Sequence, residues 1–294
     1  ISEIIKYIFN NYLIILKKFL SQKILKKRVR WNVSYKSNVN IDNIELDDFK
    51  TIENKNKDRF LADPFVVENN GKNFIFLEDF YFSKEKGIIS CYEIENGNQK
   101  FLGPVLEENF HLSFPYIFRY KNKIFMCPET HEKKEIRIYI CEEFPLKWKM
   151  YMTLMENISA VDTIIFEKDK IWWLFTCISN NNMKDFNELN IFFSDEGPLT
   201  KNWTPHHLNP VDVNPNIARN GGIIFKENKI FRISQKNGFN FYGEKFSINE
   251  IQVLDKTNFK ENLIREFSIK NKVKYKGTHH LHGTEKFLVN DYCI

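Results

Sequence analysis

Glycine and proline are scarce in this chain of 294 residues, which contains 11 and 9 of them. Such low counts exclude a collagen-like or low-complexity chain. No apolar run reaches the roughly 18 residues that a membrane-spanning helix needs. The cysteines stand at positions 91, 127, 141, 177 and 293 and form no CxxC pair. Because an odd, scattered set does not suit a disulfide framework or a zinc ribbon, we expect reduced thiols, no metal site and a cytoplasmic protein.

A net positive charge is missing from most of the chain. The formal net charge is +5, but residues 1–30 hold eight Lys or Arg and one Glu, so this segment alone carries +7. The other residues therefore sum to −2, which predicts no broad basic face and no nucleic-acid partner. The sequence contains neither a GxGxxG nor a DxD motif, so it indicates no nucleotide cofactor.

The first 28 residues have the apolar spacing of helices. Apolar residues recur there at steps of three and four, and lysines fill the other faces, which predicts one or two amphipathic helices in an arm of residues 1–29. One interpretation is a helix that packs on the body or joins it to an upstream domain, because the chain begins at Ile1 rather than at a methionine. The other is a basic helix that lies on the inner face of an anionic membrane.

After the arm, the pattern changes to short strands that alternate with turns. The hairpins that we expect begin near residues 65, 116, 164, 223 and 282, and each places Asn, Asp, Gly or Lys between two apolar runs. The period is therefore roughly 50–60 residues, which has room for four strands. This predicts an all-β fold, a five-bladed β-propeller over residues 30–294, closed by the segment 30–35. A pair of β-sandwiches is the competing architecture, but sandwiches do not need this period.

Three acidic residues stand at equivalent points of different repeats. Asp63 and Asp162 begin first strands, and Glu129 ends a second strand. Because the first strands of a propeller line its channel, we expect these carboxylates to converge. One would donate or accept a proton at a glycosidic bond, another would face the anomeric carbon or a water, and the third would adjust their pKa values. We predict these three residues as catalytic.

Basic residues near the same points predict contacts with a sugar. Arg219 stands before two glycines and suits a phosphate or carboxylate on a sugar, or else an ion pair between blades, and Arg232 is similar. His111 is expected at the mouth of the channel. In the stretch 279–282, strand alternation puts His280 and His282 on one face and turns His279 away. Without a third ligand, sugar contact is a better interpretation of this pair than metal binding.

Several motifs, taken in order, resemble a known family. They are FLADPF at 60–65, HLSFP at 111–115, CPE at 127–129, FPLKW at 144–148, AVDT at 160–163, WWLF at 172–175, LNPV at 208–211 and ARNGG at 218–222. Together with Gln235 and Tyr242, they are similar to the N-terminal propeller domain of plant glucosamine inositolphosphorylceramide transferases. The resemblance covers about residues 30–290. It implies bacterial relatives in surface-polysaccharide synthesis and a distant likeness to family 43 glycoside hydrolases.

The resemblance also implies roles for the candidate residues. By blade position, Asp63 matches the base of the family 43 hydrolases, Asp162 matches their pKa-setting residue, and Glu129 is assigned to the acid. Gln235 and Tyr242 are expected to contact the substrate, a sugar or glycan with or without phosphate. Three functions follow: sugar transfer in the synthesis of capsule or lipopolysaccharide, hydrolysis by a furanosidase type of mechanism, and a non-catalytic propeller that binds glycan for a partner transferase.

Overall fold

The computed structural model describes residues 2–19, 28–37, 39, 44–179, 187–236, 242–268, 276–284 and 286–294. In these residues, β-strands dominate, and α1 (Ser2–Phe19) is the one α-helix. Two short 3₁₀ segments, η3 (Leu46–Asp48) and η4 (His131–Lys133), interrupt the connections. The predicted all-β body is therefore confirmed. The predicted arm helix is seen as far as Phe19, and residues 20–27 lie outside the described residues.

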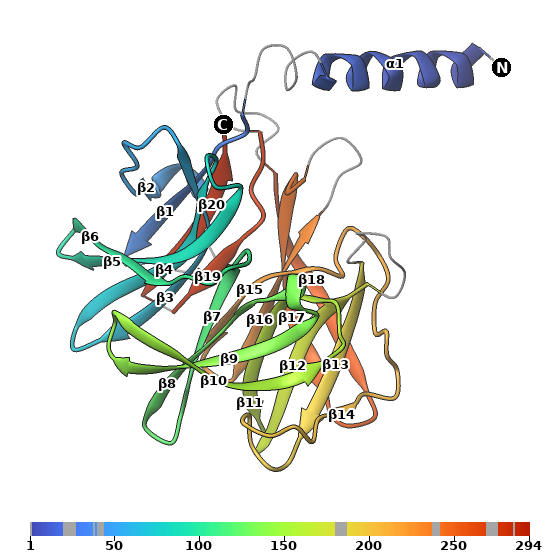
Figure 1. Cartoon of the computed structure of the whole chain (residues 1–294). Coiled ribbons are helices and arrows are strands. Elements are labelled where there is room, and N and C mark those ends of the chain that lie inside the picture. The colour runs from blue at the N-terminus through green and yellow to red at the C-terminus, as the bar shows by residue number, and fades with distance from the viewer. Residues whose placement is uncertain are drawn as a thin grey trace.

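The strands form three four-stranded sheets and one eight-stranded sheet (Figure 1). The first sheet holds β3 (Arg59–Asn69), β4 (Lys72–Tyr81), β5 (Lys86–Glu95) and β6 (Asn98–Leu106). The second holds β7 (Ser113–Tyr120), β8 (Lys123–Glu129), β9 (Glu135–Glu143) and β10 (Lys147–Glu156). The third holds β11 (Ala160–Lys168), β12 (Ile171–Ile178), β13 (Glu188–Ser194) and β14 (Thr204–Pro205).

The eight-stranded sheet divides into two runs of four. One run is β15 (Asn220–Lys226), β16 (Lys229–Lys236), β17 (Lys245–Leu254) and β18 (Phe259–Ser268). The other is β19 (Leu281–Gly283), β20 (Phe287–Cys293), β1 (Trp31–Ser37) and β2 (Lys50–Thr51). A single parallel pair, Ile224 with Gly283, joins β15 to β19. Among the described strands, the hydrogen-bonded link between the two runs is therefore made by their first strands.

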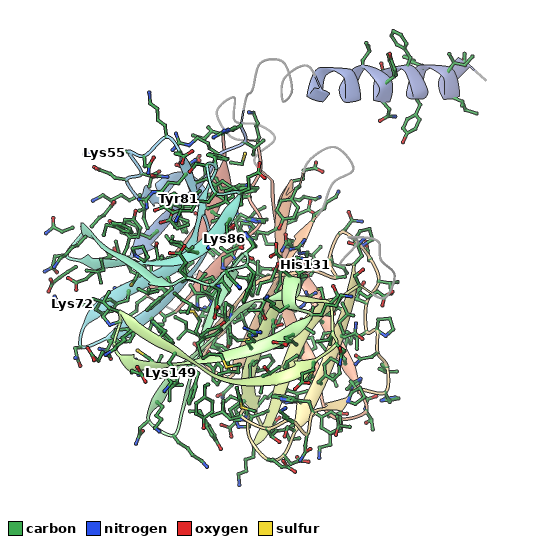
Figure 2. All side chains as sticks on the ribbon, viewed as in Figure 1. Lys55, Lys72, Tyr81, Lys86, His131 and Lys149 are labelled. Atoms are coloured by element: carbon green, nitrogen blue, oxygen red, sulfur yellow. The ribbon has the colours of Figure 1, made fainter. Side chains whose placement is uncertain are left out.

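The first strands of the runs are neighbours around a ring. β3 contacts β7, β7 contacts β11, β11 contacts β15, β15 contacts β19, and β19 returns to β3. Inner strands such as β11 are buried along almost their whole length, whereas outer strands such as β10 expose many residues. Long side chains of the periphery, Lys55 and Lys149 among them, point to solvent (Figure 2). Polar residues on the inner strands therefore lie in the interior, where a polar group needs a partner.

The five predicted hairpins are all present as antiparallel pairs of consecutive strands. Their turns follow from local chemistry. Asn70 and Gly71 both have positive φ, as do Lys121 and Asn122 in the next repeat, which suits two-residue turns of type I′. As predicted, the segment after the arm adds a strand next to the C-terminal one. β1 pairs with β20 over seven residue pairs, from Trp31 with Cys293 to Ser37 with Phe287.

Apolar side chains fill the space between neighbouring sheets. Phe65 of β3 is fully buried and meets Phe114 and Tyr116 of β7 edge-on, with ring centroids 4.8 and 5.5 Å apart. None of the five cysteines, all of which are described, forms a disulfide, and four of them are buried. This agrees with the expected free thiols.

The helix α1 lies outside the sheets in Figure 1. Ile5, Phe9 and Tyr12 stand at the spacing of one helix face and are 58–61% exposed. Among the described residues, no helix combines the length and the apolar character that crossing a membrane requires.

Candidate functional site

The same backbone irregularity recurs in the first strand of four sheets. In β3, two residues, 63 and 64, stand opposite one residue of β4, and the same bulge occurs at 114–115, 162–163 and 221–222. The first bulge residue has a left-handed φ at Asp63 (48°), Phe114 (45°) and Asp162 (53°). Aspartate tolerates this region better than most residues. The bulges redirect the side chains at equivalent points, which brings residues of distant repeats together.

A cavity of about 320 Å³ opens where these bulges meet. The residues that line it are Trp31, Phe60, Ala62, Asp63, Glu78, Phe80, His111, Ser113, Glu129, Arg219, Tyr242 and His279. Three of them are carboxylic acids, and four offer aromatic rings of Phe, Tyr or Trp. This combination of stacking surfaces and hydrogen-bonding groups in a concave site is typical of a small-molecule pocket.

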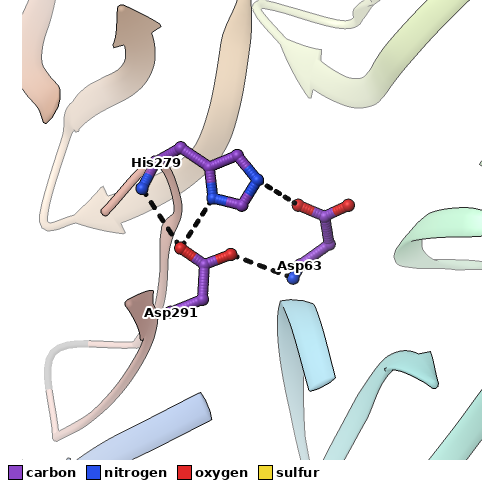
Figure 3. A group of neighbouring side chains, drawn as sticks. All are labelled: Asp63, His279 and Asp291. Carbon is purple, nitrogen blue, oxygen red and sulfur yellow. Dashed lines mark hydrogen bonds and ion pairs between the residues drawn. The ribbon is translucent and has the colours of Figure 1, made fainter. Parts of the chain in front are cut away.

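Asp63 lies at one end of a buried chain of polar groups (Figure 3). The backbone N–H of Asp63 donates a hydrogen bond to Asp291 on β20 (3.1 Å). The imidazole of His279 donates from Nδ1 to the same carboxylate (2.7 Å) and faces the Asp63 carboxylate with Nε2 at 3.6 Å. Backbone N–H groups of His279 and His280 also donate to Asp291, each at 3.1 Å. Asp291 therefore fixes both the bulge and the imidazole ring.

This arrangement sets the proton affinity of Asp63 and His279. Burial raises the pKa of Asp63 to about 7, and nearby Asp291, Asp162 and Glu129 add to the rise, whereas His279 opposes it. Burial would lower the pKa of His279, but the Asp291 and Asp63 carboxylates outweigh burial and raise it. Asp63 therefore titrates near neutral pH, and His279 holds its proton more tightly than an ordinary histidine does.

Asp63, His279 and Asp291 could also be considered as metal ligands, because each offers a ligand atom within 4.8 Å of the others. However, both ring nitrogens of His279 are directed at carboxylates, and Asp291 already accepts four hydrogen bonds. A metal ion would have to replace the imidazole protons that make these contacts. We therefore describe the group as a hydrogen-bonded chain.

Asp162 and Arg219 form an ion pair beside the cavity. Asp162 also accepts a hydrogen bond from the Gln235 amide (3.0 Å). Burial raises the pKa of Asp162 to about 6, although the Arg219 guanidinium pulls it down. The glycines after Arg219 are needed for packing, because a Cβ at Gly221 would stand 2.3 Å from the carbonyl oxygen of His279. The group that approaches these glycines closely is thus the protein backbone.

Aromatic rings form one wall of the cavity. The Trp31 ring stacks on the His279 imidazole, with centroids 4.2 Å apart, and Tyr242 meets Trp31 edge-on at 6.3 Å. The Arg219 guanidinium lies 5.3 Å from the centroid of the Tyr242 ring. This wall is assembled from β1, from the segment before β15 and from the segments next to β17 and β19, which are far apart in sequence. Its rings border the cavity.

Two glutamates face the cavity from second strands. Glu129 on β8 lies 3.3 Å from the imidazole of His131. Glu78 on β4 lies 3.6 Å from the Nε2 atom of His111. Both glutamates stand 15 positions after the first residue of their bulge, at 63 and at 114, and both pair with the residue just before it. The repeat therefore places both carboxyl groups at equivalent points.

A family model described as glucosamine inositolphosphorylceramide transferase 1, N-terminal, matches residues 18–291. The chain belongs to this family.

Curated relatives of this family come from plants. The chain is 34% identical over 208 residues to glucosamine inositolphosphorylceramide transferase 1 of Oryza sativa subsp. japonica. It is 33% identical over 208 residues to the protein of the same name from Arabidopsis thaliana. In both cases the match takes in 69% of this chain but only 27% of the relative, so the chain spans about a quarter of their length.

Solved structures with the same fold are propeller-type glycoside hydrolases. The catalytic domain of a GH62 alpha-L-arabinofuranosidase from Coprinopsis cinerea superposes with a TM-score of 0.61 and 11% identity, over 90% of this chain and 97% of the other. A family 117 glycoside hydrolase from Zobellia galactanivorans reaches 0.56 with 13% identity, over 82% and 76% of the two chains. At these identities, the likeness between this chain and the hydrolases concerns the fold alone.

The structure brings together five of the residues predicted from the sequence. Asp63, His111, Glu129, Arg219 and Tyr242 all line the cavity. Asp162 and Gln235 are not among the lining residues, but they join the site by holding Arg219 and each other. The predicted convergence of the three acidic residues is seen in the geometry, while their roles stay predictions.

Three of the predicted contact residues lie away from the cavity wall. Arg232 forms a buried ion pair with Glu261, between β16 and β18, and donates to the carbonyls of Ile217 and Ala218. It therefore ties strands together. His280 and His282 share a face, as predicted, but that face packs on Phe65 at centroid distances of 4.7 and 4.6 Å.

The expectation that His279 turns away from the site is wrong, since this histidine lines the cavity. The strand alternation on which it was based begins only at Leu281, where β19 starts. The sequence also offered no reason to select Asp291, Trp31 or Glu78. For Glu78, an alignment of the repeats at their bulges would have supplied one, because Glu78 and Glu129 have the same offset.

Proposed function

We propose that this protein is a carbohydrate-active propeller that transfers a sugar at the cavity around Asp63. The observation that carries the proposal is the convergence of Asp63, Glu78 and Glu129, in different electrostatic surroundings, beside a wall of aromatic rings. Glycosidic chemistry needs one carboxyl group that accepts a proton and one that donates it. Aromatic faces stack on sugar rings and exclude water. A cavity of about 320 Å³ is at the small end for ligand pockets, which suits a short sugar unit.

We count five blades in this propeller, over residues 30–294, with residues 1–29 as an arm. The ring of first strands from β3 to β19 supports this number, as does the single pair that joins β15 to β19. The eight-stranded sheet is then two blades in contact, and the last blade takes β1 and β2 from the N-terminal side of the chain. Closure by strands from both ends leaves no open gap in the ring.

Asp63 is the proton acceptor in this proposal. A general base works best when its pKa lies near the working pH, and that of Asp63 is raised to about 7. His279, fixed by Asp291, stands at 3.6 Å from the Asp63 carboxylate, where a charge on the imidazole stabilises the ionised form. The charge of Asp162 raises the pKa of Asp63, and its carboxylate holds Arg219 in an ion pair. Asp162 is therefore a positioning and pKa-setting group.

The names of the relatives and neighbours bear on the reaction type. The plant relatives are named as transferases, and the fold neighbours are named as glycoside hydrolases. Transfer and hydrolysis at a glycosidic bond differ only in whether the acceptor is a sugar hydroxyl or a water. We favour transfer in the synthesis of a surface glycan, on the cytoplasmic side of the membrane. A phosphate on the sugar would have to compete with Asp162 for Arg219, so a neutral sugar fits the site better.

The arm is proposed to contact the membrane. Its helix α1 exposes Ile5, Phe9 and Tyr12 on one face, and the segment 1–30 carries a charge of +7. An amphipathic helix within a basic segment of this charge binds anionic lipid surfaces.

The test is to incubate the protein with a panel of nitrophenyl glycosides and sugar acceptors, and to identify the products by mass spectrometry. Transfer yields a product with the mass of the acceptor plus the sugar, whereas hydrolysis yields the free sugar. We expect Asp63→Asn to reduce turnover at least about 100-fold, as loss of a general base does. Asp162→Asn should also reduce turnover, because it removes the partner of Arg219 and a charge that raises the pKa of Asp63. The thermal unfolding temperature of Asp63→Asn at neutral pH should not fall with the activity, whereas Asp162→Asn should lower it because Arg219 loses its buried partner.

Asp169→Asn is the matched control. Asp169 has the same left-handed backbone (φ 54°) but is exposed in the turn between β11 and β12, so its change should leave turnover unaffected. Turnover that survives Asp63→Asn would refute the proposed role of the cavity. Sugar binding that Asp63→Asn weakens by about 1–3 kcal/mol, with no product from any donor, would favour the non-catalytic function instead.

A further inference from the structure

The two glutamates of the cavity have equivalent backbone positions but opposite surroundings. Glu78 pairs with Ala62 in the first sheet, and Glu129 pairs with Ser113 in the second. Both side chains are 9% exposed and border the same cavity. Any difference in their chemistry must therefore come from the groups next to them.

Positive charge surrounds Glu129. The imidazole of His131 lies 3.3 Å from its carboxylate, and Arg219 lines the same cavity. Burial would raise the pKa of Glu129, but the hydrogen bond with His131 and the charge of Arg219 outweigh burial and lower it. In turn, the contact with Glu129 raises the pKa of His131. Glu129 is therefore ionised at neutral pH, next to an imidazole that holds its proton more tightly than an ordinary histidine does.

Glu78 faces a neutral imidazole. The Nδ1 atom of His111 accepts a hydrogen bond from the backbone N–H of Gly87 (2.9 Å), so the proton of the neutral ring is on Nε2. That Nε2 lies 3.6 Å from Glu78, beyond hydrogen-bond distance. Burial lowers the pKa of His111, which disfavours an imidazolium there. The contact is tight, since a Cβ at Gly87 would stand 2.8 Å from the His111 ring and 3.0 Å from Glu78.

The charges that act most strongly on Glu78 come from carboxylates. Burial raises its pKa well above the usual value, and Asp63, Glu129, Asp291 and Asp79 all raise it further. Among the described residues, His111 is the one cation-forming side chain within ion-pair distance of Glu78. A carboxyl group in such a place retains its proton, because ionisation would add a further negative charge to a buried acidic cluster.

We propose that Glu78, and not Glu129, is the proton donor of the cavity. The inference rests on the proposed function, because it names the group that protonates the leaving oxygen of the glycosidic bond. The protonated carboxyl group of Glu78 offers its O–H as a hydrogen-bond donor to a sugar oxygen. Glu129, as an ionised neighbour, accepts hydrogen bonds from sugar hydroxyls and stabilises positive charge that develops on the sugar ring.

The proton balance of the transfer follows from these assignments. The O–H of Glu78 gives its proton to the leaving oxygen as the bond from that oxygen to the anomeric carbon breaks, and the bond's electron pair stays on the oxygen. The acceptor hydroxyl forms the new bond with its lone pair and loses its proton to Asp63. One turnover therefore leaves Glu78 ionised and Asp63 protonated. Exchange of a proton with solvent at each group restores both.

The experiment is a carbon NMR titration of the protein labelled with ¹³C at glutamate side-chain carboxyls. Only glutamates contribute signals, so Asp63 cannot be mistaken for Glu78. We expect one glutamate carboxyl to remain protonated at pH 7 while the others are ionised. Its signal should disappear in Glu78→Gln and persist in the matched variant Glu129→Gln. Glutamine has the shape of a protonated glutamate, which favours folding of the first variant.

The wild-type spectrum decides the question even where a variant does not fold. Ionisation of all glutamates at pH 7 would overturn the inference, as would loss of the protonated signal in Glu129→Gln. Activity then separates this inference from the proposed function. Glu78→Gln should lose at least about 100-fold more activity on alkyl glycosides than on nitrophenyl glycosides, whose leaving group needs no proton. A wild-type protein without turnover refutes the proposed function, and the NMR result still shows which glutamate holds the proton.

Discussion

Asp63 combines an unusual backbone conformation with an unusual proton affinity. Its φ of 48° comes from the bulge in β3, and the hydrogen bond from its N–H to Asp291 holds that bulge in place. Its carboxyl group is buried with a pKa raised to about 7 from an ordinary value of 3.8. A raised pKa of a buried acid means that the folded state prefers the neutral form. Asp63 therefore costs stability whenever the pH forces it to ionise.

This cost predicts a pH dependence for Asp63→Asn. Below about pH 4, Asp63 is protonated in both the folded and the unfolded state and costs nothing. Between about pH 4 and 7, the folded state keeps a proton that the unfolded state has lost, so wild-type stability falls as the pH rises. Asparagine also tolerates a left-handed backbone and carries no charge. The free energy of unfolding of Asp63→Asn, relative to wild type, should therefore rise by about 1–4 kcal/mol between pH 4 and 8.

Urea unfolding at several pH values measures this difference. Asp255→Asn is a control of opposite sign, because hydrogen bonds from Thr257 and Asn258 lower the pKa of Asp255 to about 2. Its stabilising effect is present at neutral pH and is lost as the pH falls towards 2. A difference between Asp63→Asn and wild type that stays constant with pH would mean that Asp63 is ionised in the folded protein throughout.

At the scale of elements, the helix α1 and the sheets differ in how far their apolar side chains are buried. The hairpins are supported by neighbours on both sides, whereas α1 exposes large apolar side chains, with Ile5 61% and Phe9 58% accessible. Isolated helices of this length are marginal in water. A surface that buries the apolar face would stabilise α1, and an anionic lipid surface would also attract its lysines.

Liposome flotation tests this idea. The full chain should float with vesicles that contain anionic lipid and should dissociate from them as salt is raised, because the attraction is electrostatic in part. Residues 28–294 alone should stay with the soluble fraction. Equal flotation with and without residues 1–27 would show that α1 is not the membrane contact.

At the scale of the whole molecule, closure of the ring depends on β1. This strand supplies Trp31, Val33 and Tyr35, all buried, and pairs with β20 along its whole length. Burial of three such side chains contributes roughly 5–9 kcal/mol, which is comparable to the stability of an entire domain. Trp31 also stacks on His279 at the cavity. Loss of β1 should therefore destroy both the fold and the site.

Two truncations test the role of β1. Residues 28–294, which lack α1 but keep β1, should unfold cooperatively at the same temperature as the full chain. Residues 38–294 should lose this transition or show it at a much lower temperature. Calorimetry measures both. Equal unfolding temperatures for the two truncated chains would show that the ring is stable without its N-terminal strand.

The hairpins and their period could be predicted from the sequence because they depend on local properties. Strand alternation and left-handed turn residues such as Asn70 and Gly71 act within a few residues. The repeat then places Asp63, Asp162 and Glu129 at equivalent points, which was sufficient to predict that they meet. Arg219 could be selected because two glycines follow it, although the sequence left open whether it binds a ligand or forms an ion pair between blades.

Only the tertiary structure decided which side chains face the cavity and which of them hold protons. His279 rather than His280 lines the site because Asp291, from a strand that follows it in the chain, holds its ring by a hydrogen bond at 2.7 Å. Glu78 and Glu129 share one offset in the repeat, yet one faces a neutral His111 and the other His131. The sequence determines the elements because backbone propensities are local, whereas proton affinity depends on burial and on charges that only folding brings within a few ångströms.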